Sequence, residues 1–169
     1  MDFLHPPAGG FDLSCLAATP DSSATFTEHE ELKAILLAGS AHFDTQAVGE
    51  IATRGPSFAL YTASIGSRDP LAPAVGFFGG IHGLERIGTQ LILAWMRALL
   101  FRLEWDELLH QQLQKVRLVF MPIVNPGGMW AHKRANPHGV DLMRNAPQRA
   151  ESPVPFLAGG QTFGPLLPW

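Results

Sequence analysis

The segment 74–81 is an apolar run with two glycines near its end, and a helical pattern follows it after only a few residues. An apolar run of this length, bounded by turn residues, predicts a buried strand. Gly79 and Gly80 permit the unusual backbone angles or the close approach that the end of such a strand requires. The apolar segment 87–103 predicts the helix. Because the end of a strand before the start of a helix is a common location for active sites in α/β sheets, we expect functional residues in the turn between them.

That turn contains His82 and Glu85, three residues apart. Imidazole nitrogen and carboxylate oxygen are both normal zinc donors, and a catalytic zinc site uses three protein ligands while leaving a fourth position for water or substrate. A histidine and a glutamate at this spacing also occur together by chance, so the spacing alone is weak evidence. Their location between a strand and a helix favours the hypothesis that both residues bind a metal.

A second group of polar residues follows the next strand-like run, 116–122. The run leads into the turn cluster 125–128, for which backbone geometry is a sufficient explanation. Arg134 and Arg144 come next. A guanidinium group is planar, permanently charged and able to hold a carboxylate through two parallel hydrogen bonds. A surface salt bridge or a solvated loop is the alternative interpretation of both arginines.

Taken together, these segments resemble the zinc carboxypeptidases of the carboxypeptidase A/B type. The order is strand, His-x-x-Glu, helix, strand, Asn-Pro-x-Gly, and then Arg-x-Asn-x-x-Gly-Val-Asp-Leu-x-Arg-Asn, and it spans residues 48–145. Two motifs in the correct order, each behind its own strand, are far more specific than either alone. The resemblance implies a hydrolase that requires zinc, with His82 and Glu85 as the first two zinc ligands.

The same resemblance implies roles for residues of the second motif. Arg134 is similar to the arginine that polarises the scissile carbonyl and holds the oxyanion, and Arg144 to the arginine that pairs with the free carboxylate of the substrate. Met143 occupies a position that is usually asparagine in this family. A thioether offers no hydrogen-bond donor, so carboxylate recognition is weaker, arranged differently or aimed at another group. Asp141 is either a catalytic carboxylate or a turn former, and we treat it as structural.

The rest of the family's zinc site has no clear counterpart in this sequence. The family's third ligand is a histidine on a later strand and its catalytic glutamate comes later still, but no histidine follows His138 and the only acid after Asp141 is Glu151. His132 or His138 could replace the third ligand. Both, however, lie inside the loop that carries the arginines, where a solvated histidine is more common than a metal ligand. We therefore expect this chain to contain only part of the active site.

The expected domain organisation follows from the same resemblance. The end of the chain, 156–169, is apolar, rich in turn residues and uncharged, and catalytic domains of the family are considerably longer than 169 residues. We expect 1–22 to be a loose lead-in and 23–169 to be the N-terminal part of a metallopeptidase-like catalytic domain that is incomplete at its C-terminus.

Composition limits the partners and the location. The net charge of −3 at pH 7 and the absence of a Lys/Arg cluster argue against a nucleic-acid-binding surface. The single cysteine, Cys15, suits a reducing compartment, and the N-terminus lacks the pattern of a signal peptide, so we expect a cytoplasmic protein. Arg97 and Arg102 interrupt the apolar segment 87–103, so we expect no transmembrane helix.

The remaining elements predict the fold class. Thr27 as a cap with Glu30 three residues later indicates a helix start, 48–53 and 57–65 predict an antiparallel hairpin, and 105–115 predicts an amphipathic helix. The predicted fold is α/β, with three layers (α/β/α) and a mixed, mainly parallel twisted sheet of the zinc carboxypeptidase kind.

The expected activity is zinc-dependent amide hydrolysis, as in a metallocarboxypeptidase that removes C-terminal residues from peptides. An N-acyl amino-acid deacylase of the aspartoacylase or succinylglutamate desuccinylase kind is the enzymatic alternative, because it resembles this chain in its zinc pair and its Asp-Leu-x-Arg pattern. The third hypothesis is a truncated relative of these enzymes that binds a ligand but does not catalyse a reaction. In each case the ligand is a peptide or an acyl-amino acid with a free carboxylate, and the oligomeric state is left open.

Overall fold

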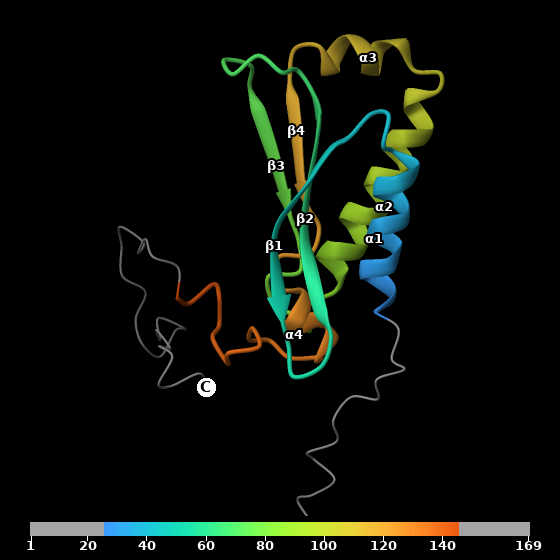
Figure 1. The fold of residues 1–169 in the computed structure, drawn as a ribbon. Coiled ribbons are helices and arrows are strands. Elements are labelled where there is room, and N and C mark those ends of the chain that lie inside the picture. The colour runs from blue at the N-terminus through green and yellow to red at the C-terminus, as the bar shows by residue number, and fades with distance from the viewer. Residues whose placement is uncertain (1–25, 146–169) are drawn as a thin grey trace, which may run out of the picture.

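The computed structural model describes residues 26–145, which form a four-stranded sheet with helices on one face (Figure 1). In chain order, the elements are α1 (Thr27–Ala38), β1 (Asp44–Ala52), β2 (Ser57–Gly66), β3 (Ala74–Phe78), α2 (Ile87–Leu103), α3 (Glu107–Leu113), β4 (Arg117–Met121) and α4 (Pro126–Trp130). The predicted segments 1–22 and 156–169, together with Cys15 and Glu151, lie outside the described residues.

The strand order in the sheet is β1-β2-β4-β3. Strands β1 and β2 form the predicted antiparallel hairpin, β2 pairs with β4 antiparallel, and β3 pairs with β4 parallel. The predicted mixed sheet is confirmed, but within residues 26–145 it is not mainly parallel, because two of its three pairings are antiparallel. Because β3 and β4 are parallel, the segments that follow them emerge at the same edge of the sheet. Both sequence motifs therefore lie at that edge.

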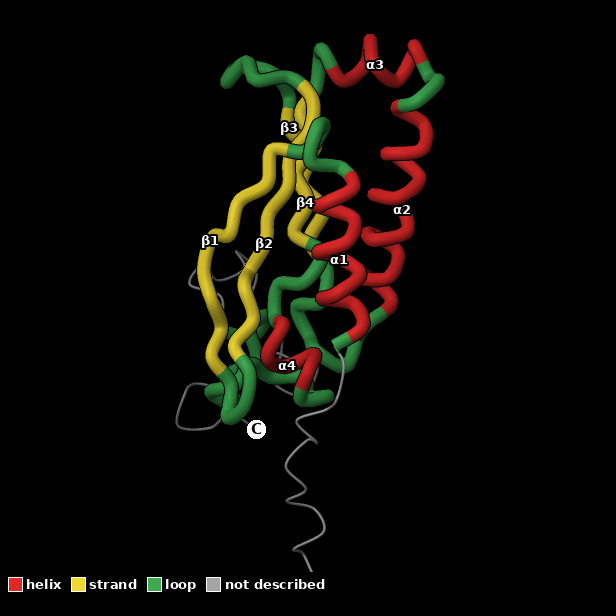
Figure 2. The backbone as a smooth tube through the Cα atoms, turned by 45° about the vertical axis from the view of Figure 1, so that its right-hand side comes forward, coloured by secondary structure: helices red, strands yellow, loops and turns green. Residues whose placement is uncertain are grey.

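The core lies between the sheet and the helices α1 and α2, which run side by side on the same side of the sheet (Figure 2). At its centre Phe120 of β4 is fully buried and packs against Phe77 of β3 and Trp95 of α2, with ring centroids 5.5 and 5.2 Å away. Residues three and four apart on α2 supply much of the rest, as expected for a helix with one face against a sheet. These buried residues are Ile92, Leu93, Met96, Leu99 and Leu103.

Two local expectations about the helices were wrong. Helix α1 does begin at Thr27, but Phe26 occupies the cap position and no side chain caps the helix. The segment after β4 is not only a turn, because Pro126–Trp130 forms the short helix α4 with Asn125 as its cap. Proline in the first turn and asparagine before it are both favoured at helix starts. No helix within residues 26–145 has the length and apolar character needed to cross a bilayer.

Thr89, in the first turns of α2, links that helix to the end of β4. Its side chain is fully buried, and Oγ1 donates a hydrogen bond of 2.7 Å to the carbonyl oxygen of Pro122. This bond fixes the start of α2, and with it the turn that holds His82 and Glu85, to the strand that leads into the second motif.

We expect Thr89→Val to lower the free energy of unfolding by about 1–3 kcal/mol, because the buried carbonyl of Pro122 would lose this hydroxyl donor and its desolvation would no longer be compensated. Urea denaturation followed by circular dichroism measures this loss. Thr45→Val on the exposed part of β1 is the matched control and should be nearly neutral. An equally small effect at both positions would show that the Thr89 bond does not stabilise the fold.

Candidate active site

The segments that follow β3 and β4 are held together by their backbones. The amide nitrogens of Val124 and Asn125 donate to the carbonyl oxygens of Gly79 and Gly80, at 2.9 Å in both cases. Beyond these bonds the chains approach even more closely, since a Cβ atom at Gly83 would collide with the backbone of Gly128. Glycine at position 83 is therefore required for the turn that contains His82 to lie directly on α4.

Asn125 fixes the two motifs relative to each other from a buried position. Its side-chain Nδ2 donates to the carbonyl oxygens of Ile81, at 3.2 Å, and Arg134, at 3.4 Å, while its Oδ1 accepts from the amide of Gly128 at 2.9 Å. The residue before His82 and the backbone of Arg134 thus share one amide group. From the sequence, Asn125 was expected only to form a turn, although an asparagine directly before a proline is a signal for a helix cap.

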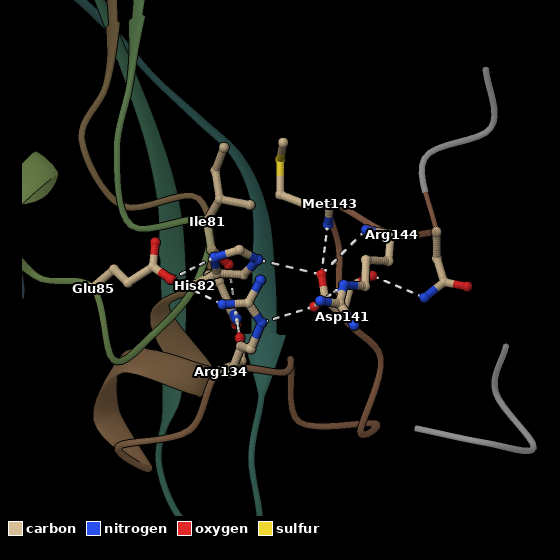
Figure 3. A network of polar contacts seen from close by, with 9 residues as sticks. Ile81, His82, Glu85, Arg134, Asp141, Met143 and Arg144 are labelled. Carbon is tan, nitrogen blue, oxygen red and sulfur yellow. Dashed lines mark hydrogen bonds and ion pairs between the residues drawn. The ribbon is translucent and has the colours of Figure 1, made fainter. Parts of the chain in front are cut away.

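His82 lies between two carboxylates (Figure 3). Its Nδ1 is 3.0 Å from Oε1 of Glu85, and its Nε2 is 3.3 Å from Oδ1 of Asp141. If Nε2 carries the proton and donates it to Asp141, a neutral imidazole presents its Nδ1 lone pair to a carboxylate oxygen. Two lone pairs at this distance need a proton or a cation with them, and imidazole nitrogen and carboxylate oxygen are zinc donors. The pair therefore fits a metal ion.

Asp141 is the acceptor around which the other groups gather, and its side chain is only 1% exposed. Oδ1 accepts from the amides of Met143 and Arg144 at 3.0 and 3.2 Å as well as from His82, and Oδ2 accepts from Nε of Arg134 at 2.9 Å. Burial raises the pKa of this carboxyl, but the hydrogen bonds from Arg134, from the amide of Arg144 and from His82 outweigh it and lower the pKa below its ordinary value. Asp141 shapes a turn, as predicted, and it also holds His82 and Arg134.

Of the predicted site residues, His82, Arg134, Met143 and Arg144 contact this carboxylate directly, and Glu85 is linked to it through Arg134. Arg134 bridges Asp141 to Glu85, whose Oε1 lies 2.9 Å from NH1. Arg144 is more distant, with its Nε 3.8 Å from Oδ2 of Asp141. Met143 is exposed, and its side chain points to the same side of the site as that of Ile81 in Figure 3. The carboxylate of Glu85 is 60% exposed, so the site is open to solvent on the side of Glu85.

The structure places neither His132 nor His138 beside His82 and Glu85, which are called the metal pair below. His132 has a left-handed backbone (φ 52°) and its Nδ1 lies 3.3 Å from NH2 of Arg86. His138 is exposed at a tight turn. Within residues 26–145, no group of three or more histidine, cysteine, aspartate or glutamate side chains is arranged to hold a metal ion. The described part of the chain thus brings the two predicted donors, His82 and Glu85, together, and it places no further histidine beside them.

Comparison with known sequences gives a consistent result. The family model described as zinc carboxypeptidase matches residues 47–160. Carboxypeptidase SOL1 of Arabidopsis thaliana is 34% identical over 77 residues, which cover 46% of this chain and 16% of that protein. The human carboxypeptidase N catalytic chain is 32% identical over 96 residues, covering 48% of this chain and 21% of that protein. The chain therefore spans less than a quarter of the length of these relatives.

Comparison with solved structures shows the fold. A metallo-carboxypeptidase from Burkholderia cenocepacia superposes with a TM-score of 0.57 at 18% identity, over 74% of this chain and 34% of that one. Thrombin activatable fibrinolysis inhibitor superposes with a TM-score of 0.51 at 18% identity, over 70% of this chain and 32% of that one. Residues 26–145 thus form part of the expected zinc carboxypeptidase fold, with helices described on one face of the sheet.

We expect Asp141→Asn to lower the free energy of unfolding at pH 7 by about 2–3 kcal/mol, because the amide cannot accept charge-assisted hydrogen bonds of the same strength from Arg134 and His82. A carboxyl whose pKa is lowered in the folded state stabilises the fold above its unfolded pKa of about 4, and this stabilisation is lost as the pH falls through the folded value. The difference between the two proteins in urea denaturation should therefore narrow below about pH 4. A difference that is independent of pH would contradict the role given to this charge.

Proposed function

Because this chain belongs to the zinc carboxypeptidase family, we propose that it contributes to a peptidase site that removes residues from the C-terminus of peptides. The observation that supports this most directly is the convergence of His82, Glu85, Arg134 and Arg144 around the buried carboxylate of Asp141. In this arrangement His82 and Glu85 are the pair of metal donors. Arg134 is a cation beside them, and Arg144 is a second cation further away. A substrate amide and its terminal carboxylate need groups of these kinds.

In this proposal Nδ1 of His82 and the carboxylate of Glu85 would hold the zinc ion. Zinc, when bound, supplies activation of a water molecule and polarisation of the amide carbonyl. Asp141 accepts from Nε2 of His82 and so directs the lone pair of Nδ1 toward Glu85. A carboxylate in this position also raises the basicity of the imidazole and fixes its ring orientation. The chain thereby presents a preorganised pair of donors.

The two arginines suit different parts of the substrate. Arg134 is held at its Nε by Asp141 and at NH1 by Glu85, so its positive charge is fixed beside the metal pair, where it would stabilise an oxyanion that develops during amide hydrolysis. Nε of Arg144 lies 3.8 Å from Oδ2 of Asp141, further from this oxygen than Nε of Arg134, and a guanidinium is well suited to hold a carboxylate by two hydrogen bonds. The exposed thioether of Met143 beside it adds apolar surface rather than a donor.

The proteins found by comparison favour the peptidase over the deacylase alternative, since the relatives described above are named as carboxypeptidases. The substrate therefore becomes, in our proposal, a peptide with a free C-terminal carboxylate.

The metal pair is tested by zinc titration of the purified chain in a calorimeter. We expect weak but measurable binding to the native chain, because only two protein donors lie in its described part, and we expect His82→Ala to abolish it. His138→Ala, which removes an exposed histidine of the loop, is the matched control and should leave binding unchanged. If His82→Ala binds zinc as the native chain does, the ligand assignment is wrong.

The substrate is tested on the protein as its native source makes it, with a short peptide, the same peptide amidated at its C-terminus, and an N-acyl amino acid. We expect cleavage of the free peptide and little cleavage of the amide. Arg144→Lys should lower kcat/KM for the free peptide by about 10–100-fold, since hydrogen bonds to charged groups contribute about 1.5–3 kcal/mol, and should leave the slow reaction of the amide nearly unchanged. Activity on the acyl-amino acid alone would favour the deacylase.

A further inference from the structure

Arg86 follows Glu85 directly and joins three segments of the fold. Its NH1 donates to both carboxylate oxygens of Glu28 in α1, at 2.7 and 2.8 Å. Its NH2 donates to the carbonyl oxygen of Met129 in α4 at 2.9 Å and lies 3.3 Å from Nδ1 of His132. One guanidinium therefore connects the metal-binding turn to α1, to α4 and to the chain that leads to Arg134.

The burial of these groups makes the connection hard to replace. Glu28 is buried and Met129 is fully buried. A buried carboxylate is costly unless it is paired and hydrogen-bonded, and the loss of its partner leaves the charge uncompensated. The planar, fixed fork of a guanidinium can hold Glu28 and the carbonyl of Met129 at the same time, whereas an ammonium group is a single point charge.

The position of Glu85 depends on this anchor. The only polar contacts that hold its half-exposed side chain in the described structure are with His82 and Arg134, at 3.0 and 2.9 Å. Asp141 fixes the imidazole of His82 from one side. The residue that follows Glu85, Arg86, is attached to the buried carboxylate of Glu28 and to the carbonyl oxygen of the buried Met129.

We propose that Arg86 is a positioning residue for the metal pair. By tying the backbone after Glu85 to α1 and α4, it sets the place at which the Glu85 carboxylate meets Nδ1 of His82. Its contact with His132, whose backbone is left-handed, also steers the chain toward Arg134. This inference rests on the proposed function, because it presumes that His82 and Glu85 bind the metal.

The chain offers a matched comparison for a simple stabilising role. Arg97 of α2 forms an ion pair with Glu31 of α1, whereas Arg86 is the residue directly before α2. The ion pair of Arg97 joins α1 to α2, as Arg86 and Glu28 do at the start of α2, but Arg97 lies well over two turns further along α2 from the metal pair. An effect that results only from loosening α1 from α2 should therefore follow from either arginine.

The test is calorimetric zinc titration of Arg86→Met and Arg97→Met, with urea denaturation of each. Loss of a residue that orients metal ligands typically lowers metal affinity about 10–100-fold. We expect a loss of about tenfold for Arg86→Met and unchanged affinity for Arg97→Met, even where both lower the stability. Equal weakening in the two variants, or none in Arg86→Met, would overturn the positioning role.

A second variant covers the case in which Arg86→Met fails to fold. Arg86→Lys keeps a positive charge opposite Glu28 but cannot reproduce the fork, so its zinc affinity should also fall while the fold is retained. Native affinity in Arg86→Lys would overturn the inference. His82→Ala separates this inference from the function on which it rests: zinc binding that His82→Ala leaves intact overturns the metal pair itself, whereas binding that is lost in His82→Ala but unaltered in Arg86→Met and Arg86→Lys overturns only the role of Arg86.

Discussion

Asp141 places a carboxylate where its side chain is 1% exposed, and such a group is costly to bury without partners. Its partners are the side chains of His82 and Arg134 and the amides of Met143 and Arg144. The cost of burial is therefore offset only when both sequence motifs are in place. The geometry of the metal pair and of the cations beside it follows from the requirement that this single charge be satisfied.

The guanidinium groups of the site lie against its carboxylates. Arg134 is shared between Asp141 and Glu85, of which one is buried and the other exposed, and Nε of Arg144 lies 3.8 Å from Oδ2 of Asp141. If Glu85 held a metal ion, Arg134 would keep its bond to Asp141 through Nε, and its NH1 would be available to a substrate oxygen.

The fold was predictable from the sequence where its causes are local. The hairpin 48–53 and 57–65 and the helix 87–103 follow from apolar periodicity, and the structure contains them. Thr27 was wrongly predicted as a cap because Phe26 is instead buried against Phe58, with ring centroids 5.1 Å apart, and this packing fixes the start of the helix. The full role of Asp141 was missed because its partner His82 is 59 residues away. The roles of His82, Glu85 and the arginines remain predictions, and the structure gives the distances between these side chains.

The contact between Gly83 and Gly128 has a mechanical consequence. Where two backbones touch without intervening side chains, there is no soft layer that could absorb a relative displacement, since packed interiors transmit strain. The side-chain amide of Asn125 also joins the same two segments, through its hydrogen bonds to the carbonyl oxygens of Ile81 and Arg134. The backbone of the turn with His82 and Glu85 and that of the loop with Arg134 should therefore move as a single rigid body. Thermal motion would then shift His82, Glu85 and Arg134 together and leave the distances between their backbones unchanged.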